Sequence, residues 1–293
     1  MCINMMSFLP KMMIVLIFFE MFFNVATSQN ESIHINYEVS WGRDHISYLK
    51  GGQEVQLSLE RFSGCGFMSK AYYGSGFFRM MIKVPPKDSA GVVTAFYLHR
   101  DIGDVHDELD FEFLGNRPGK KIKLQTNVII NGIGGREQGI YLWFDPTADF
   151  HEYRILWNQH QIVFFVDDTP IRIFKNDNYT SVIGYPSLPM QVHISIWNAS
   201  WATDGGKTKI IWSHSPFQAH FQYFHIDGCP SDQNIPNQDC YSTKYRWNIE
   251  KYWQINPRQK KKYDNVRKKY LYYDYCTGKG VTRPECVGHN LTI

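Results

Sequence analysis

The sequence predicts an all-β sandwich, and two observations lead to this fold class. Many short stretches alternate apolar and polar residues, and turn-forming residues such as glycine and proline separate them. A period of two is typical of β-strands, because successive side chains point to opposite faces of a sheet. Few stretches show the apolar spacing of an amphipathic helix. With 293 residues, 43% of them hydrophobic, the chain is long enough for one large β-domain with a sizeable core.

Residues 1–28 are predicted to be a secretory signal peptide. Lys11 precedes an apolar run over residues 12–25, and the small residues Ala26-Thr-Ser28 follow. This order of a basic flank, a short apolar run and small residues is typical of a cleaved leader. The run is shorter than the ~20 apolar residues of a membrane-spanning helix, and we find no second stretch of that length. We therefore expect a mature chain that starts near Gln29 and has no membrane segment.

The strands are expected mainly before residue 200. They are predicted at residues 37–41, 54–59, 77–84, 92–98, 106–113, 123–130, 139–144, 153–157, 161–166, 171–174 and 190–197. Glycine-containing turns are expected at residues 50–53 and 63–67, and Pro85-Pro86 ends the strand before it. Residues 92–98 are nearly all apolar, so this strand is expected in the centre of a sheet.

The composition changes near residue 228, where we predict a boundary with a C-terminal extension over residues 229–293. Residues 231–238 are mostly polar and typical of a loop. Residues 258–270 are rich in lysine and arginine, and Lys260-Lys-Lys262 and Arg267-Lys-Lys269 stand about two helical turns apart. This spacing predicts a helix with a basic face.

The cysteines outside the predicted leader indicate an oxidising compartment. Cys229 and Cys240, and Cys276 and Cys286, are two close pairs that predict two local disulfides. A zinc site is the weaker alternative, because neither pair has C-x-x-C spacing and no histidine is suitably spaced. Cys65 is left over and is predicted to be a buried free thiol. Sequons, each a candidate for glycosylation, occur at Asn30, Asn178, Asn198 and Asn290.

The stretch His106-Asp-Glu-Leu-Asp-Phe-Glu-Phe-Leu-Gly115 carries three acids on one face of a predicted strand. Glu108, Asp110 and Glu112 alternate with leucine and phenylalanine, so the opposite face packs on a core. Carboxylates crowded in one site often have shifted pKa values and catalytic roles. An exposed acidic face, or half of a calcium site, is the alternative that this pattern alone leaves open.

Three acids in a row suit glycoside hydrolysis, in which one carboxyl protonates the leaving oxygen and another attacks the sugar or activates water. The α-carbons of Glu108 and Glu112 would stand about 13 Å apart on a straight strand at ~3.3 Å per residue. A retaining enzyme needs its carboxyls ~5–5.5 Å apart, so the two side chains would have to lean together over Asp110. The spacing alone does not distinguish retaining from inverting chemistry. Between them, Asp110 can share a proton or a hydrogen bond with the nucleophile.

Several blocks in the same order resemble the plant xyloglucan endotransglucosylase/hydrolases of glycoside hydrolase family 16. The stretch His106–Asn116 is similar to the active-site signature of that family. The other similar blocks are Ser89–Tyr97, Gln125-Thr-Asn127, Gly135-Arg-Glu-Gln138, Tyr141–Thr147, Ile196-Trp-Asn198, Trp201-Ala-Thr203, Tyr273-Asp-Tyr-Cys276 and Pro284-Glu-Cys286. Together they cover nearly the whole predicted mature chain.

The resemblance implies a concave two-sheet antiparallel β-jelly-roll sandwich as the catalytic domain, residues 29–228. A short disulfide-bonded extension would lengthen the acceptor side of its cleft. It also implies retaining chemistry, with Glu108 as nucleophile, Glu112 as general acid/base and Asp110 as helper. Carried over by motif, the substrate-binding residues would be His106, Gln125, Thr126, Asn127, Arg136, Glu137, Ser200, Trp201 and Gly205.

Three features depart from the family pattern. Many relatives carry a sequon directly after the signature, whereas Asn116-Arg-Pro118 is not one. Trp197-Asn-Ala-Ser-Trp201 is one residue shorter than the common Trp-Asn-Ala-Asp-Asp-Trp, which puts the adjoining sugar subsites, and Ser200 especially, in question. The tail between Cys276 and Cys286 is short, so we assign Arg283 no role.

The resemblance implies a secreted, monomeric enzyme of the plant cell wall (apoplast) that needs no cofactor or metal. It would cut the β-1,4-glucan backbone of xyloglucan and join it to a second xyloglucan chain, so donor and acceptor polysaccharides would be its partners. The net charge of +3 is too small to indicate nucleic acid. The basic helix would present a solvated face, with contact to acidic wall polymers such as pectin as the alternative.

Two rival functions are kept. The first is an enzyme of the same class that mainly hydrolyses xyloglucan. No long insertion of the kind associated with hydrolytic members is obvious, so transfer is favoured. The second is a carbohydrate-binding sandwich without catalysis, which has no need for three acids in a row.

Overall fold

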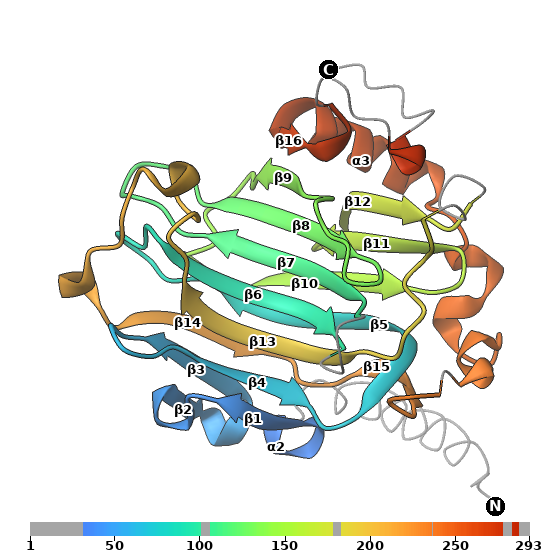
Figure 1. Ribbon diagram of the computed structural model, residues 1–293, viewed down its shortest axis with the longest axis horizontal. Helices are drawn as coiled ribbons and strands as arrows, with labels where there is room; N and C mark the ends of the chain where they lie inside the picture. Colours follow the sequence, from blue (N-terminus) through green and yellow to red (C-terminus); the bar gives the residue numbers. More distant parts are fainter. Residues whose placement is uncertain (1–31, 101–105, 178–182, 236, 278–282, 287–293) are drawn as a thin grey trace, which may run out of the picture.

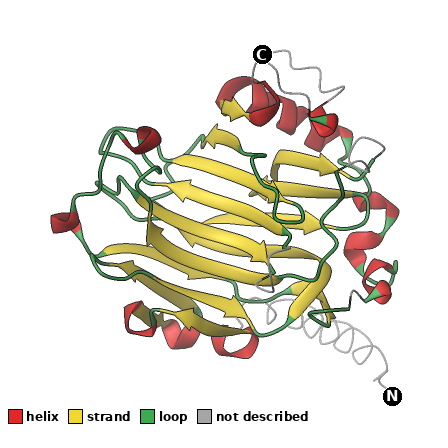
Figure 2. Cartoon of the chain, in the orientation of Figure 1, coloured by secondary structure: helices red, strands yellow, loops and turns green. Residues whose placement is uncertain are grey.

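The chain folds into two antiparallel β-sheets packed face to face (Figures 1 and 2), which confirms the predicted all-β sandwich. The computed structural model describes residues 32–100, 106–177, 183–235, 237–277 and 283–286. The predicted leader and the sequons at Asn30, Asn178 and Asn290 lie outside these residues. Among the helices described, none has the length and apolar character needed to cross a membrane.

The first sheet carries the acidic strand near its middle, as Figure 1 shows. In spatial order it consists of β1 (Tyr37–Trp41), β4 (Cys65–Ser69), β13 (Gln191–Asn198), β6 (Val92–His99), β7 (Glu108–Leu114), β8 (Lys123–Ile129), β9 (Gln138–Tyr141) and β16 (Leu271–Asp274). The predicted central position of β6 is confirmed, because β13 and β7 pair with its two sides.

The second sheet lies behind the first in Figure 1. Its order is β12 (Thr169–Lys175), β11 (Gln161–Val166), β10 (His151–Trp157), β5 (Tyr72–Lys83), β14 (Phe217–Gln222), β3 (Glu54–Leu59) and β2 (Ile46–Leu49), and β15 (Asp227–Ser231) also pairs with β5. The main core lies between the two sheets.

The apolar face of β7 anchors the acidic strand in this core. Phe111 is fully buried, and its ring packs edge-on against Tyr153 and Phe164 of the second sheet, with centroid distances of 5.7 and 5.1 Å. Burying a phenylalanine of this kind stabilises the fold by about 1.5–3 kcal/mol. The alternation of the strand therefore holds its acidic face outward.

The expected turn at residues 63–67 is corrected in part, because residues 65–67 are the start of strand β4. Cys65 pairs with Ile196 of β13, and Trp41 of β1 pairs with the neighbouring Gly66. A Cβ on Gly64 would lie 2.0 Å from the carbonyl oxygen of Ile196. The glycines here permit a close approach of strands rather than a change of chain direction. Cys65 itself is buried and free, as predicted, and burial raises the pKa of its thiol to about 12.

Among the described residues, one helix is long and the others are short. Helix α2 (Ile33–Asn36) precedes β1, and short 3₁₀ segments occur at Arg43–His45, Lys50–Gly52, Asp204–Gly206, Trp212–His214, Gln238–Tyr241, Arg246–Asn248, Glu250–Tyr252, Tyr275–Thr277 and Pro284–Cys286. Helix α3 (Pro257–Tyr270) confirms the predicted basic helix. Asn256 and Gln259 form a capping box at its start. Tyr263 and Val266 are its buried residues, and it packs on β12.

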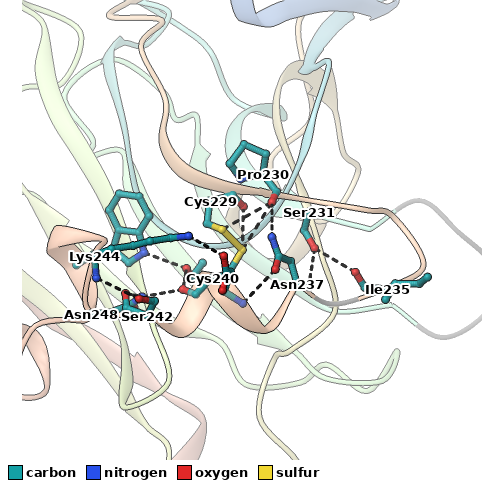
Figure 3. Close-up of a disulfide and its surroundings, with 12 residues drawn as sticks. Cys229, Pro230, Ser231, Ile235, Asn237, Cys240, Ser242, Lys244 and Asn248 are labelled. Carbon is teal, nitrogen blue, oxygen red and sulfur yellow. Dashed lines mark hydrogen bonds and ion pairs between the residues drawn. A yellow bond between two sulfur atoms is a disulfide. The ribbon is translucent and has the colours of Figure 1, made fainter.

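The C-terminal extension is built into both sheets. The boundary predicted after residue 228 falls inside β15, which pairs with β5, and β16 extends the first sheet beyond β9. Gly139 of β9 is needed there, since a Cβ would lie 2.3 Å from the ring of Tyr272. Both predicted disulfides are confirmed, Cys229–Cys240 (Figure 3) and Cys276–Cys286.

Candidate active site

The acidic face of β7 forms the floor of an open cleft of ≈ 580 Å³. The cleft is lined by residues of β7, β8, the loop before β9, the segment after β13 and the extension. These residues are Glu108, Asp110, Glu112, Gln125, Asn127, Ile129, Glu137, Trp201 and Tyr273. Three consecutive segments within residues 108–137 therefore meet two segments from distant parts of the sequence around the three predicted catalytic acids.

Strand register gives each acid a neighbour on β8. Asp110 stands opposite Asn127, and Glu112 stands opposite Gln125. Side chains in register on neighbouring strands share one face of the sheet. The amide Nε2 of Gln125 accordingly donates a hydrogen bond of 3.0 Å to Oε2 of Glu112.

Glu108 lies between two histidines. Its Oε2 is 3.3 Å from Nδ1 of His99 on β6 and 3.4 Å from Nε2 of His106. Burial raises the pKa of Glu108. The contact with His99, a hydrogen bond from Asp110 and the charges of the two histidines lower it, and together they outweigh burial. The net pKa of Glu108 is below its usual value, so this carboxylate stays ionised when its neighbours are protonated.

Asp110 is the most buried of the three acids, with 6% of its surface exposed. Burial, the charges of Glu108 and Glu112, and a hydrogen bond to Glu108 raise the pKa of Asp110 well above its usual range. Asp110 therefore keeps its proton and donates it in a hydrogen bond to Glu108. This placement is compatible with the helper role that the resemblance implied, which stays a prediction.

Glu112 is poised as an acid. Burial raises its pKa, the hydrogen bond from Gln125 lowers it, and the charges of Glu108 and Glu137 raise it again, to about 6. Between the lowered pKa of Glu108 and about pH 6, Glu112 is mostly protonated while Glu108 is mostly ionised. Two carboxyls whose environments separate their pKa values in this way are suited to opposite catalytic roles.

Five of the nine predicted substrate-binding residues line the cleft or contact one of its three acids. Gln125, Asn127, Glu137 and Trp201 line the cleft, and His106 contacts the nucleophile candidate. The indole of Trp201 is 45% exposed, so one apolar face is available to a sugar ring.

Thr126 and Arg136 do not line the cleft, which corrects two predictions. Thr126 follows Gln125 on β8 and therefore faces the core, where it is 2% exposed and its hydroxyl accepts a hydrogen bond from buried Arg172. Arg136 is 4% exposed, and its Nε donates to Oε1 of Glu285 at 2.8 Å. A motif match does not reveal that a polar residue is used inside the fold.

Ser200 and Gly205 are exposed in the segment after β13, beside the cleft residue Trp201 but not among the residues that line the cleft. Gly205 has a φ of 63°, a left-handed conformation that favours glycine. The sequon Asn198 ends β13 and is exposed.

Sequence reasoning missed His99, Ile129 and Tyr273. Ile129 follows Asn127 by two residues, so strand parity would have found it. His99 reaches Glu108 because the two residues pair between β6 and β7. Tyr273 arrives from the C-terminal extension, and its cleft position depends on the pairing of β16 with β9.

Comparison with known proteins identifies the family of the chain. Residues 33–214 match the family model described as "Glycosyl hydrolases family 16". Among curated proteins, the chain is 56% identical to xyloglucan endotransglucosylase/hydrolase protein 2 of Arabidopsis thaliana, over 84% of each chain. It is 49% identical to xyloglucan endotransglucosylase/hydrolase protein A of Phaseolus angularis, over 86% of this chain and 87% of that one.

Solved structures share the fold at low sequence identity. A Bacillus licheniformis beta-glucanase matches with a TM-score of 0.56 and 23% identity, over 70% of this chain and 96% of that one. The Crh5 transglycosylase in complex with NAG matches with a TM-score of 0.57 and 20% identity, over 71% and 84%. The chain therefore belongs to the xyloglucan endotransglucosylase/hydrolases of glycosyl hydrolases family 16.

Proposed function

We propose that the protein cuts the β-1,4-glucan backbone of xyloglucan and joins the new end to a second xyloglucan chain, with retention of configuration. The observation that carries this proposal is the row of acids on β7 at the cleft floor: Glu108 beside two histidines, buried Asp110, and Glu112, whose pKa burial raises to about 6. The names of the relatives supply the polysaccharide and the type of reaction.

In the first step, Glu108 attacks the anomeric carbon and Glu112 protonates the leaving glycosidic oxygen. One chain fragment departs with a free hydroxyl, and the other forms an ester with Glu108. Asp110 supports this step by orienting Glu108 through the hydrogen bond between them. When Glu108 loses its charge in the ester, it no longer raises the pKa of Glu112, so that Glu112 ionises more readily.

In the second step, Glu112 has given up its proton and acts as base. It takes a proton from a hydroxyl of the incoming xyloglucan chain, whose oxygen displaces Glu108 from the anomeric carbon. A second inversion at this carbon restores the original configuration. The same intermediate is hydrolysed when water replaces the acceptor, so hydrolysis is the second candidate, and the relatives' names include both activities.

Two exposed aromatic residues support the binding of a glucan chain. Trp201 and Tyr273 line the cleft with 45% and 49% of their surfaces exposed. Aromatic rings supply large apolar contact surfaces, which suits the faces of sugar rings. Because Tyr273 belongs to β16, we assign the extension to substrate binding on the acceptor side. Gln125 and Asn127 offer amide groups on the cleft floor.

The decisive assay uses purified protein with xyloglucan, in the presence and absence of labelled xyloglucan oligosaccharides. Transfer predicts that label enters polymer. Hydrolysis predicts new reducing ends without incorporation of label. Affinity for xyloglucan with neither product would overturn the catalytic proposal and favour a binding module.

We also propose that the protein is secreted into the cell wall as a monomer. The predicted leader and the two disulfides support an oxidising compartment. Terminal sequencing of the secreted protein should find a start near Gln29. Gel filtration should give a mass near that of one chain.

A further inference from the structure

We propose that His99, His106 and Glu108 form a zinc-binding site whose occupation inhibits the enzyme. The binding itself is independent of the reaction, whereas the inhibition rests on the proposed role of Glu108 as nucleophile. The three donor atoms, Nδ1 of His99, Nε2 of His106 and a carboxylate oxygen of Glu108, lie within 4.8 Å of one another.

Two of the three donor–donor distances fit a tetrahedral metal site. Oε2 of Glu108 is 3.3 Å from Nδ1 of His99 and 3.4 Å from Nε2 of His106. Two donors that each stand ~2.0–2.1 Å from a tetrahedral zinc ion are about 3.3 Å apart. The two imidazole rings meet edge to face with centroids 5.0 Å apart, and their donor nitrogens lie within 4.8 Å of each other, so closing the triangle requires the two nitrogens to approach each other on metal binding.

Nδ1 of His99 faces Glu108 without ideal hydrogen-bond geometry, which leaves it available as a metal ligand. Its Nδ1 is buried and forms no hydrogen bond, although Oε2 of Glu108 is only 3.3 Å away. A short contact with poor hydrogen-bond alignment is the geometry expected of two ligands that both point at a third centre. A buried donor without a partner also calls for a specific explanation.

The ligand set identifies the class of metal. Two imidazoles and one carboxylate are a set that binds Zn²⁺ in proteins, whereas Ca²⁺ and Mg²⁺ prefer sites made of oxygen atoms. The three side chains are 20–27% exposed, so the site opens toward solvent and the fourth position can hold water. A zinc ion here is reachable from the cleft and displaces no core residue.

Occupation of this site removes the nucleophile from the reaction. The metal engages the carboxylate of Glu108 and its positive charge lowers the electron density that the oxygen can offer to an anomeric carbon. We therefore expect reversible inhibition of both transfer and hydrolysis by Zn²⁺. A chelator should restore activity, and Ca²⁺ or Mg²⁺ at the same concentration should not inhibit.

The test measures Zn²⁺ binding by calorimetry on the full mature chain and on His99→Gln, His106→Gln and His220→Gln. His220 is the matched control, because it contacts Glu54 at 3.0 Å on the second sheet without a second histidine in the contact. The first two variants should lose zinc affinity by at least about tenfold, since even outer-shell partners of a metal contribute that much. The control should bind as the parent does.

Co²⁺ provides a second readout that does not depend on activity. The parent should show the intense visible absorption of tetrahedral Co²⁺, and both cleft variants should lose it. Parent-like Zn²⁺ affinity in a folded His99→Gln or His106→Gln variant would overturn the site, as would an octahedral Co²⁺ spectrum in the parent. Zinc bound through these ligands with full transfer activity would support the site but contradict the role of Glu108.

Discussion

Single residues around Glu112 set the pH at which it can act as an acid. Gln125 stabilises the anion through a hydrogen bond and so lowers the pKa of Glu112, whereas the charge of Glu137 raises it. Because Glu112 must be protonated for the first step, activity should fall as pH rises through about 6.

Two substitutions should move this alkaline limb in opposite directions. Gln125→Ala removes a hydrogen bond to the anion, so the pKa of Glu112 rises and the limb moves to higher pH. Glu137→Gln removes a repelling charge, so the pKa falls and the limb moves to lower pH. Profiles of kcat/KM against pH measure both shifts. If the alkaline limb moved in the same direction in the two variants, the assignment of Glu112 would be contradicted.

Glu108→Ala should abolish transfer and hydrolysis while the fold remains intact. The reason is that no ester can form without this carboxylate. Circular dichroism checks the fold, and Glu38→Ala, at an exposed glutamate on β1, is the control that should retain activity. Residual turnover within about tenfold of the parent, a barrier change of only ~1.4 kcal/mol, would remove Glu108 from the nucleophile role.

At the scale of elements, the loop before β9 is tied to the C-terminal segment by a buried ion pair. Nε of Arg136 lies 2.8 Å from Oε1 of Glu285, and both side chains are at most 4% exposed. Arg283 also approaches Glu285, at 3.9 Å, but is 34% exposed. The resemblance implied that Arg136 binds substrate. Its burial indicates instead that it holds Glu137 and β9 in place through the ion pair with Glu285.

Arg136→Ala should therefore lower stability rather than weaken substrate binding directly. It strands the carboxylate of Glu285 in the interior, which costs about 3–5 kcal/mol in free energy of unfolding. Arg283→Ala, the exposed partner, should cost less than about 1 kcal/mol. Denaturant unfolding compares the two variants. An unchanged unfolding midpoint with a raised KM in Arg136→Ala would restore the substrate role.

At the scale of the whole molecule, two disulfides of similar loop length have different neighbours. Cys229–Cys240 spans 11 residues and Cys276–Cys286 spans 10. The first packs in a cluster with Trp247. The second lies three residues after Tyr273, which lines the cleft. Its loop contains Glu285, the ion-pair partner of Arg136.

Replacing either pair by serines should reduce the free energy of unfolding by a similar amount, roughly 3 kcal/mol from loop entropy. Only loss of Cys276–Cys286 should also raise KM for the acceptor chain, because it loosens the extension beside the cleft. Unfolding curves and acceptor kinetics on the two double variants test this. Equal acceptor KM values in both would remove the extension from substrate binding.

The alternation of residues 106–113 was enough to predict which face of β7 carries the three acids, because strand parity is a local property of the backbone. The sequence by itself also determined the basic helix, whose charge spacing and capping residues lie within one segment. It predicted a turn where β4 runs, since glycine marks both turns and close strand contacts.

The residues that surround the acids could not be predicted from local patterns, because long-range pairing brings them together. His99 contacts Glu108 because of strand register, and Tyr273 lines the cleft because β16 pairs with β9. Arg136 is buried in an ion pair with Glu285, which lies 149 residues away in the sequence. The separation of the three pKa values depends on the same placement. Burial and charge act through space, so neighbours distant in sequence decide which carboxyl holds a proton.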